Sequence, residues 1–231
     1  MLRQREIARV AGAAAIGALG VSTSMAPADI VASFGFTELT SSFTFDEGAG
    51  DGLFIADGNL DTTGDVTRLL PVGNTALYNP GTIDNSPAAV HFQISVFNIN
   101  SVAKTADGLG SFSIVDADGD VLLGSFSGSW SGAGFGFTFY AGTGVDYSFD
   151  SSNGNGTFDG PSGGSFSTDF GVENLIGAVS LLFQQPNMGF FTSSFARVSA
   201  QADGVMILPA PGTMALSGLG LGILGVRRRR R

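Results

Sequence analysis

Hydrophobic and polar residues alternate with a period of two along much of the chain. In the clearest run, Val90, Phe92, Ile94 and Val96 alternate with polar neighbours. Because successive side chains of a strand point to opposite faces, this pattern predicts strands that bury one face. Shorter runs repeat it, with expected inward residues Phe34, Phe36, Phe43, Phe45, Phe112, Ile114, Phe126, Trp130, Phe135, Phe137, Phe139, Tyr147 and Phe149.

Segments rich in glycine, aspartate, asparagine and serine separate these runs, as in residues 46–52, 57–65 and 150–164. These residue types tolerate the backbone geometry of turns. Many short strands joined by such turns predict an all-β domain, either an antiparallel β-sandwich or a jelly roll. The segment 174–185 fits either a helix face or a strand, and we favour the strand.

Composition supplies a core but few reactive groups. All 20 Phe lie between Phe34 and Phe195, and burying one Phe contributes about 1.5–3 kcal/mol. The chain has no Cys, which excludes disulfides, thiolate zinc sites, Cys nucleophiles and a lipid-anchored Cys. His91 is the only histidine, which excludes His-rich metal sites.

Charge is distributed unevenly along the chain. Eight of the 11 basic residues lie in the two end segments, whereas residues 29–208 contain three basic and 19 acidic residues. The formal net charge of that central region is therefore −16. Such a domain repels nucleic acid and anionic membrane surfaces, so we expect no nucleic-acid partner. Solubility, salt tolerance and cation binding all fit this charge.

The N-terminal segment has the three-part pattern of a secretory signal peptide. Three arginines among the first nine residues precede the apolar run 10–21, which is 12 residues long. Ala26 and Ala28 occupy the −3 and −1 positions for cleavage by signal peptidase before Asp29. An uncleaved anchor or a buried helix is the alternative, but the run is shorter than the roughly 20 residues of a membrane span.

The C-terminal segment also has three parts. Pro209, Ala210, Pro211 and Gly212 form a non-helical break, because proline fixes φ and lacks an N–H. The apolar segment 212–226 would span about 22 Å as a helix, against a hydrocarbon core of about 30 Å. This marginal membrane span would be oriented and retained by the arginines that follow it. They are Arg227, Arg228, Arg229, Arg230 and Arg231.

Together with the N-terminal signal, this order of proline motif, short span and arginine cluster resembles the PEP-CTERM sorting signal. The resemblance covers residues 208–231, and Ala210 stands where the family name has Glu. It implies processing by an exosortase after transient retention in the membrane, in a bacterium that makes extracellular polysaccharide. A simple C-terminal anchor is the alternative, but it leaves both prolines unexplained.

The sharpest local motif is Asp116-Ala-Asp118-Gly-Asp120, between two hydrophobic runs that predict a hairpin. Three carboxylates at alternate positions can converge on Ca²⁺, which prefers oxygen ligands. The segment lacks the Gly at position 6 and the Glu at position 12 of an EF-hand loop. An acidic, solvated turn with Gly119 at its corner is the alternative that this incomplete match favours. Calcium is thus the single cofactor candidate.

A second loop carries Asp150, Asn153, Asn155 and Asp159, whose irregular spacing favours a flexible loop over an ion site. Asn155-Gly-Thr also fits the acceptor pattern for N-glycosylation, a short pattern that is common by chance.

Catalytic signals are weak. His91 is opposite in phase to its hydrophobic neighbours, which predicts a surface residue of a strand, and no G-x-S-x-G motif is present. Two carboxylates suffice for a glycosidase, but nothing selects a pair. Trp130, Tyr140 and Tyr147 are either a sugar-stacking platform or core, and the phase of Trp130 favours core.

These patterns divide the chain into a signal peptide (1–28), a β-rich exported domain (29–208) and a sorting signal with a hydrophobic helix (209–231). Our leading hypothesis is a non-enzymatic structural or adhesive protein of the cell surface or the biofilm matrix, associated with exopolysaccharide. A secreted carbohydrate-binding module is the second hypothesis, and a polysaccharide hydrolase is the third.

Overall fold

The computed structural model describes residues 29–83, 89–133, 136–172, 175–185 and 189–208. Within them the chain forms twelve strands and no α-helix, which confirms the all-β prediction and the strand interpretation of residues 175–184. The strands are β1 (Ile30–Asp46), β2 (Asp51–Asp57), β3 (Thr63–Arg68), β4 (Thr75–Tyr78), β5 (Val90–Asn100), β6 (Thr105–Val115), β7 (Val121–Gly132), β8 (Phe137–Asp150), β9 (Thr157–Asp159), β10 (Ser165–Ser167), β11 (Leu175–Gln184) and β12 (Phe195–Ile207).

Eight of these strands close into a barrel. The order β12-β11-β8-β7-β6-β5-β2-β1 returns to its start because β1 also pairs with β12, and every pairing is antiparallel. The prediction of a β-sandwich or jelly roll is therefore wrong in its finer form. A sandwich and a barrel show the same alternation along each strand, so the sequence pattern does not distinguish them.

The long strand β1 makes this closure possible because it changes partner along its length. Residues 32–37 pair with β3, residues 40–46 pair with β2, and β12 accompanies β1 along its other edge. Between the two halves, Glu38 has φ +58° and the register with β12 shifts. Such a bulge bends a strand, and here it turns β1 from one side of the barrel to the other.

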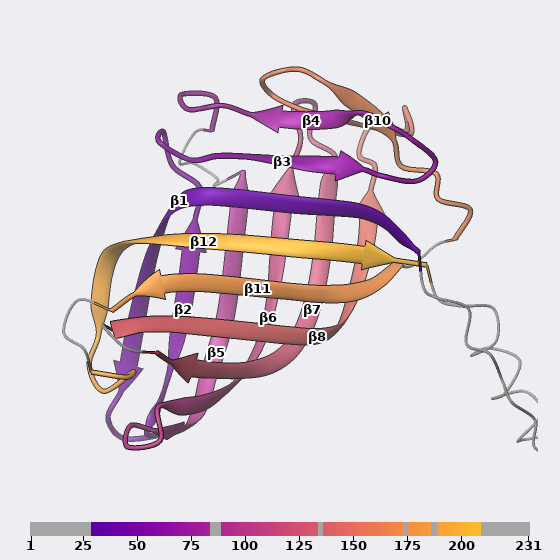
Figure 1. The fold of residues 1–231 in the computed structure, drawn as a ribbon. Helices are drawn as coiled ribbons and strands as arrows, with labels where there is room; N and C mark the ends of the chain where they lie inside the picture. Colours follow the sequence, from indigo (N-terminus) through magenta and orange to yellow (C-terminus); the bar gives the residue numbers. More distant parts are fainter. Residues whose placement is uncertain (1–28, 84–88, 134–135, 173–174, 186–188, 209–231) are drawn as a thin grey trace, which may run out of the picture.

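The barrel is flattened into two faces whose strands cross. Figure 1 shows β1, β12 and β11 running across the front, with β5, β6 and β7 crossing behind them. The β3–β4 hairpin extends the sheet from β1, and the separate β9–β10 hairpin lies next to β4. Backbone hydrogen bonds join Leu77 of β4 to Ser162 and Gly163, so the edge of β4 is covered by the β9–β10 loop.

Aromatic side chains from both faces fill the barrel. Phe54 of β2 is fully buried, with its ring 5.1 Å from Trp130 and 4.9 Å from Phe183. Phe34 of β1 lies 5.2 Å from Phe112 of β6, which joins the front face to the back. This confirms the expected Phe-rich core, which includes Phe34, Phe36, Phe43, Phe92, Phe112, Phe126, Trp130 and Tyr147, while Phe45 and Phe149 are partly buried.

The prediction that Phe137 and Phe139, in the first half of β8, face the core is wrong. Phe137 and Phe139 are 41% and 42% exposed, whereas Thr138 and Tyr140 are buried; Phe135 lies outside the described residues. The cause is a β-bulge at Gly144, which has φ +64°. Gly144 has no paired residue in either neighbouring strand, β7 or β11. An extra residue reverses the phase, so Phe139 and Tyr147 face opposite ways despite their even spacing.

We predict that Phe54→Ala destabilises the protein by about 3–5 kcal/mol, because it removes a buried ring and leaves a cavity. Phe139→Ala removes the same side chain from the outer face of β8 and should cost less than about 1 kcal/mol. Urea denaturation followed by tryptophan fluorescence measures both. Equal losses for the two variants would contradict the phase reversal at Gly144.

Candidate functional site

The acidic motif forms the tip of the β6–β7 hairpin, as predicted. Oδ1 of Asp116 accepts hydrogen bonds from the backbone N–H groups of Asp118, Gly119 and Asp120 at 3.0, 2.9 and 2.8 Å. Gly119 has φ +98°, a conformation that favours glycine at the corner of the turn. One carboxylate thus organises the whole turn.

The structure brings the second oxygen-rich loop onto this hairpin. The side-chain amides of Asn153 and Asn155 both donate to Oδ2 of Asp118, the latter at 2.9 Å. The backbone N–H of Asp159 donates to Oδ2 of Asp116 at 2.8 Å. Asp150 is exposed at the end of β8. The sequence does not reveal this contact, because the two loops are more than 30 residues apart.

Asp120 is the most enclosed carboxylate of the cluster. It is 2% exposed and accepts hydrogen bonds from Ser151, Ser152 and Asn153. Burial acts to raise the pKa of Asp120, but these hydrogen bonds outweigh it, and the pKa is lowered from its ordinary value. In contrast, burial raises the pKa of Asp116 above its ordinary value. The loop therefore contains two buried carboxyl groups with opposite tendencies.

Asp116, Asp118 and Asp120 can each present a carboxylate oxygen within 4.8 Å of the others. This geometry meets the expectation that the three groups converge, and oxygen ligands suit Ca²⁺. However, each carboxylate already accepts hydrogen bonds from protein donors. Because both amides donate to Oδ2 of Asp118, a bound Ca²⁺ would use Oδ1 of Asp118 or displace an amide from Oδ2. Calcium thus remains a proposal.

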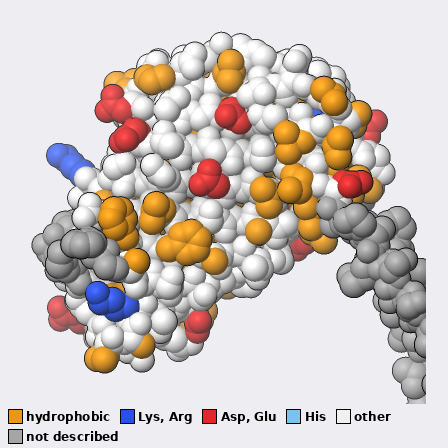
Figure 2. All heavy atoms as spheres, in the orientation of Figure 1, with side chains coloured by type: hydrophobic (Ala, Val, Ile, Leu, Met, Phe, Trp, Pro, Cys, Tyr) orange, Lys and Arg blue, Asp and Glu red, His pale blue; other side chains and the backbone are white. Residues whose placement is uncertain are grey.

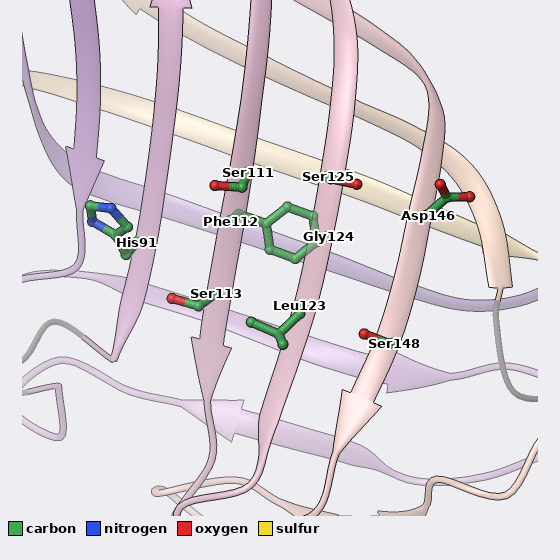
Figure 3. Close-up of a pocket in the computed structure, with 9 residues that line it drawn as sticks. All are labelled: His91, Ser111, Phe112, Ser113, Leu123, Gly124, Ser125, Asp146 and Ser148. Atoms are coloured by element: carbon green, nitrogen blue, oxygen red, sulfur yellow. The ribbon is translucent and has the colours of Figure 1, made fainter.

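A second candidate site is a trough of about 360 Å³ on the outer face of β5 to β8. Figure 3 shows its lining, in which short side chains stand on four neighbouring strands. His91 pairs with Ser113 and Ser111 pairs with Ser125, so polar groups form rows across the sheet. The trough is lined by His91, Ser111, Phe112, Ser113, Leu123, Gly124, Ser125, Asp146 and Ser148.

His91 lies at the surface of its strand, as predicted, and Nδ1 donates to Oδ1 of Asp57 at 2.6 Å. Ser111 and Ser113 point towards the strand that carries His91 (Figure 3). Within the described residues, no hydrogen bond joins His91 to a serine. The N–H groups of these central strands are used in the ladder, which leaves none for an oxyanion. The trough presents hydroxyl groups that can exchange hydrogen bonds with a polar ligand.

The possible sugar-stacking platform is core. Trp130, Tyr140 and Tyr147 are each at most 1% exposed, with their rings inside the barrel. The hydroxyl of Tyr147 donates to the carbonyl of Ala178 at 2.6 Å, and that of Tyr140 donates to Gly108 at 3.2 Å. These aromatic faces are therefore closed to a ligand.

The predicted processing residues lie outside the described residues. They are Ala26, Ala28, Pro209, Ala210, Pro211, Gly212 and Arg227 to Arg231. Among the residues that the structure describes, no helix has the length and apolar character to cross a membrane. No protein-family model matches the chain, and no curated protein or solved structure is significantly similar to it.

We predict that Asp120→Asn lowers stability at neutral pH by about 1–3 kcal/mol, because the buried hydrogen bonds favour the charged carboxylate. A lowered folded-state pKa contributes stability above the unfolded pKa of about 3.9, and this contribution is lost as pH falls through the folded pKa. The wild-type and variant unfolding free energies should therefore converge as the pH falls through the folded-state pKa of Asp120. Urea unfolding from pH 7 to pH 2 tests this, and a pH-independent difference would contradict it.

Any stabilisation of the protein by calcium should depend on the carboxylates of the same hairpin. At 100 times its dissociation constant a ligand adds about 2.7 kcal/mol, so millimolar Ca²⁺ should raise the melting temperature relative to chelator. The double variant Asp118→Asn with Asp120→Asn should remove that rise. An unchanged wild-type melting temperature, or a rise that survives in the double variant, would rule out calcium at this loop.

Proposed function

We propose that this protein is a non-enzymatic structural or adhesive protein of the bacterial cell surface or extracellular matrix, exported through its N-terminal signal and sorted by an exosortase. The terminal patterns support it: a signal peptide with Ala26 and Ala28, and a PEP-CTERM-like tail from Pro209. Signal peptidase and exosortase would be its processing partners. The membrane would hold the tail only before processing, and extracellular polysaccharide would surround the mature protein.

The observation that carries the proposal is the position of the two ends of the barrel domain. Ile30 pairs with Ile207, and the backbone N–H of Leu208 donates to the carbonyl of Asp29 at 3.2 Å. The predicted signal peptide and the predicted sorting signal would therefore join the barrel domain at one point. A domain attached at one point can be presented by its tail while the rest of its surface stays accessible.

The core and the surface charge of the barrel domain also suit an extracellular protein. Its stability comes from an aromatic core rather than from disulfides, since the chain has no Cys. Figure 2 shows acidic side chains scattered over one face, with little basic surface between them. A net charge far from zero favours solubility and discourages self-association.

A carbohydrate-binding module is the second candidate, because the trough at His91 presents rows of hydroxyl groups and a carboxylate from Asp146. Such groups can exchange hydrogen bonds with sugar hydroxyls. Binding of the purified protein to a glycan panel distinguishes this function from a purely structural one, with Ser111→Val and Ser125→Val as trough variants. Release of reducing sugar from the same panel would instead support a hydrolase.

We predict that residues 205–231 act as a transferable sorting signal. Fused to an exported reporter in a host with an exosortase, they should retain the reporter at the membrane and then be cleaved near residues 209–212. The short span alone anchors weakly, so replacing the five terminal arginines with Ser should release the reporter uncut. Immunoblots of membrane and medium fractions measure both steps.

Replacing Pro209 and Pro211 is the matched control, because it leaves the span and the arginines intact. This variant should still be retained at the membrane but should not be cleaved. Normal processing of the proline variant would favour a simple anchor over a sorting signal. Normal processing of the arginine variant would contradict the role assigned to charge.

A further inference from the structure

Arg68, at the end of β3, is a buried base in an acidic domain. Only three basic residues lie between residues 29 and 208, and Arg68 is 8% exposed. Arginine is almost never this buried unless its charge is paired, because removing an ion from water is costly. Groups around Arg68 must therefore stabilise its buried charge.

Neutral groups hold the guanidinium of Arg68. It donates to the backbone carbonyls of Ser167 and Asp169, the latter at 2.8 Å, and stacks on Phe170 with Cζ 4.4 Å from the ring centroid. Gly73 covers the aliphatic stem, where an added Cβ would lie 2.8 Å from Cβ of Arg68. These contacts hold the planar guanidinium fork of Arg68 in place, but only two of its five N–H groups donate hydrogen bonds to them.

The described residues supply no direct counter-ion. Their single ion pair is between His91 and Asp57, so no described carboxylate lies within 4.0 Å of the Arg68 guanidinium. The carboxylate of Asp169 instead accepts the N–H of Gly171 at 2.8 Å. Among the residues that the structure describes, the Arg68 guanidinium therefore keeps N–H donors without a protein acceptor, and these can receive an anion.

A pocket of about 620 Å³ adjoins this fork, between the end of β3, the turn after it and β10. These elements lie together at the top of Figure 1. Its polar lining includes Asn74 and Ser165, and Pro71 and Val72 add apolar surface. Ligand pockets usually occupy about 300–1,000 Å³, so this one accommodates more than a small inorganic ion.

We propose that Arg68 and its pocket bind an organic carboxylate of monosaccharide size, namely a uronic acid unit. A planar carboxylate matches the guanidinium fork and can accept two parallel hydrogen bonds from it. The amide of Asn74 and the hydroxyl of Ser165 offer partners for sugar hydroxyls. The carboxylate site stands independently of export and sorting, whereas its assignment to a uronic acid rests on the proposed association with polysaccharide.

The surrounding charge opposes this binding and thereby provides a test. Asp169 lines the same pocket, and the domain as a whole carries −16. Removing the Asp169 charge should therefore strengthen carboxylate binding, by roughly two- to fivefold for a partly exposed pair. Asp169→Asn retains an oxygen that can accept the Gly171 N–H, so the loop should keep its shape.

The experiment measures the melting temperature of the full chain in sodium glucuronate, glucose, sodium acetate or sodium chloride at matched concentration. At about ten times the dissociation constant, glucuronate should raise the melting temperature by about 3 °C. Glucose and sodium chloride should not reproduce this shift. Equal shifts with either would overturn the site, and an equal shift with acetate would overturn the uronic acid assignment.

Three variants locate the effect. Arg68→Lys keeps the charge but loses the fork, so it should abolish most of the glucuronate shift, whereas Asp169→Asn should reach half of the maximal shift at a lower glucuronate concentration. Asp61 is exposed and does not line the pocket, so Asp61→Asn should leave the shift unchanged. A normal shift in Arg68→Lys, no gain in Asp169→Asn, or a gain in Asp61→Asn equal to that in Asp169→Asn would overturn the proposal.

Discussion

The pairing of β1 with β12 is the constraint on which the rest of the molecule depends. It joins the first strand to the last over residues 30–43 and removes the two free edges that an open sheet would expose. Because the strands close on themselves, their inner faces enclose one space, and that space is filled by aromatic rings. The same pairing places Asp29 beside Leu208, so one contact sets both the core and the point of attachment.

Closure requires strands that bend, and irregular residues provide the bends. Glu38 adopts a left-handed backbone conformation where β1 changes partner, and its backbone carbonyl accepts a hydrogen bond from Asn59 at 2.6 Å. Gly144 bulges from β8, where no described atom lies within 4 Å of an added Cβ. Bulges increase local twist and curvature, which a barrel of aromatic-filled strands needs at its corners.

Polar groups in this acidic domain are satisfied mainly by neutral partners. The buried carboxylates of Asp116 and Asp120 accept backbone and hydroxyl donors, and buried Arg68 donates to carbonyl groups. Such hydrogen bonds connect segments that are far apart in the sequence: the β6–β7 hairpin to the loop after β8, and β3 to the end of β10 and the loop after it. The candidate calcium loop and the Arg68 pocket lie at these two junctions, where the fold already positions charged groups.

Local chemistry determined much of this protein by itself. Alternation set the strand class and most of the core, and the Asp-Gly pair set the hairpin at Gly119, because both depend on neighbouring residues. The terminal addresses are likewise sequence patterns, and they stay predictions. Only the tertiary structure decided the barrel, the outward turn of Phe139, the meeting of Asp118 with Asn155 and the pocket at Arg68. Strand order and one-residue phase shifts depend on pairing between distant segments, and no periodicity along one segment encodes that pairing.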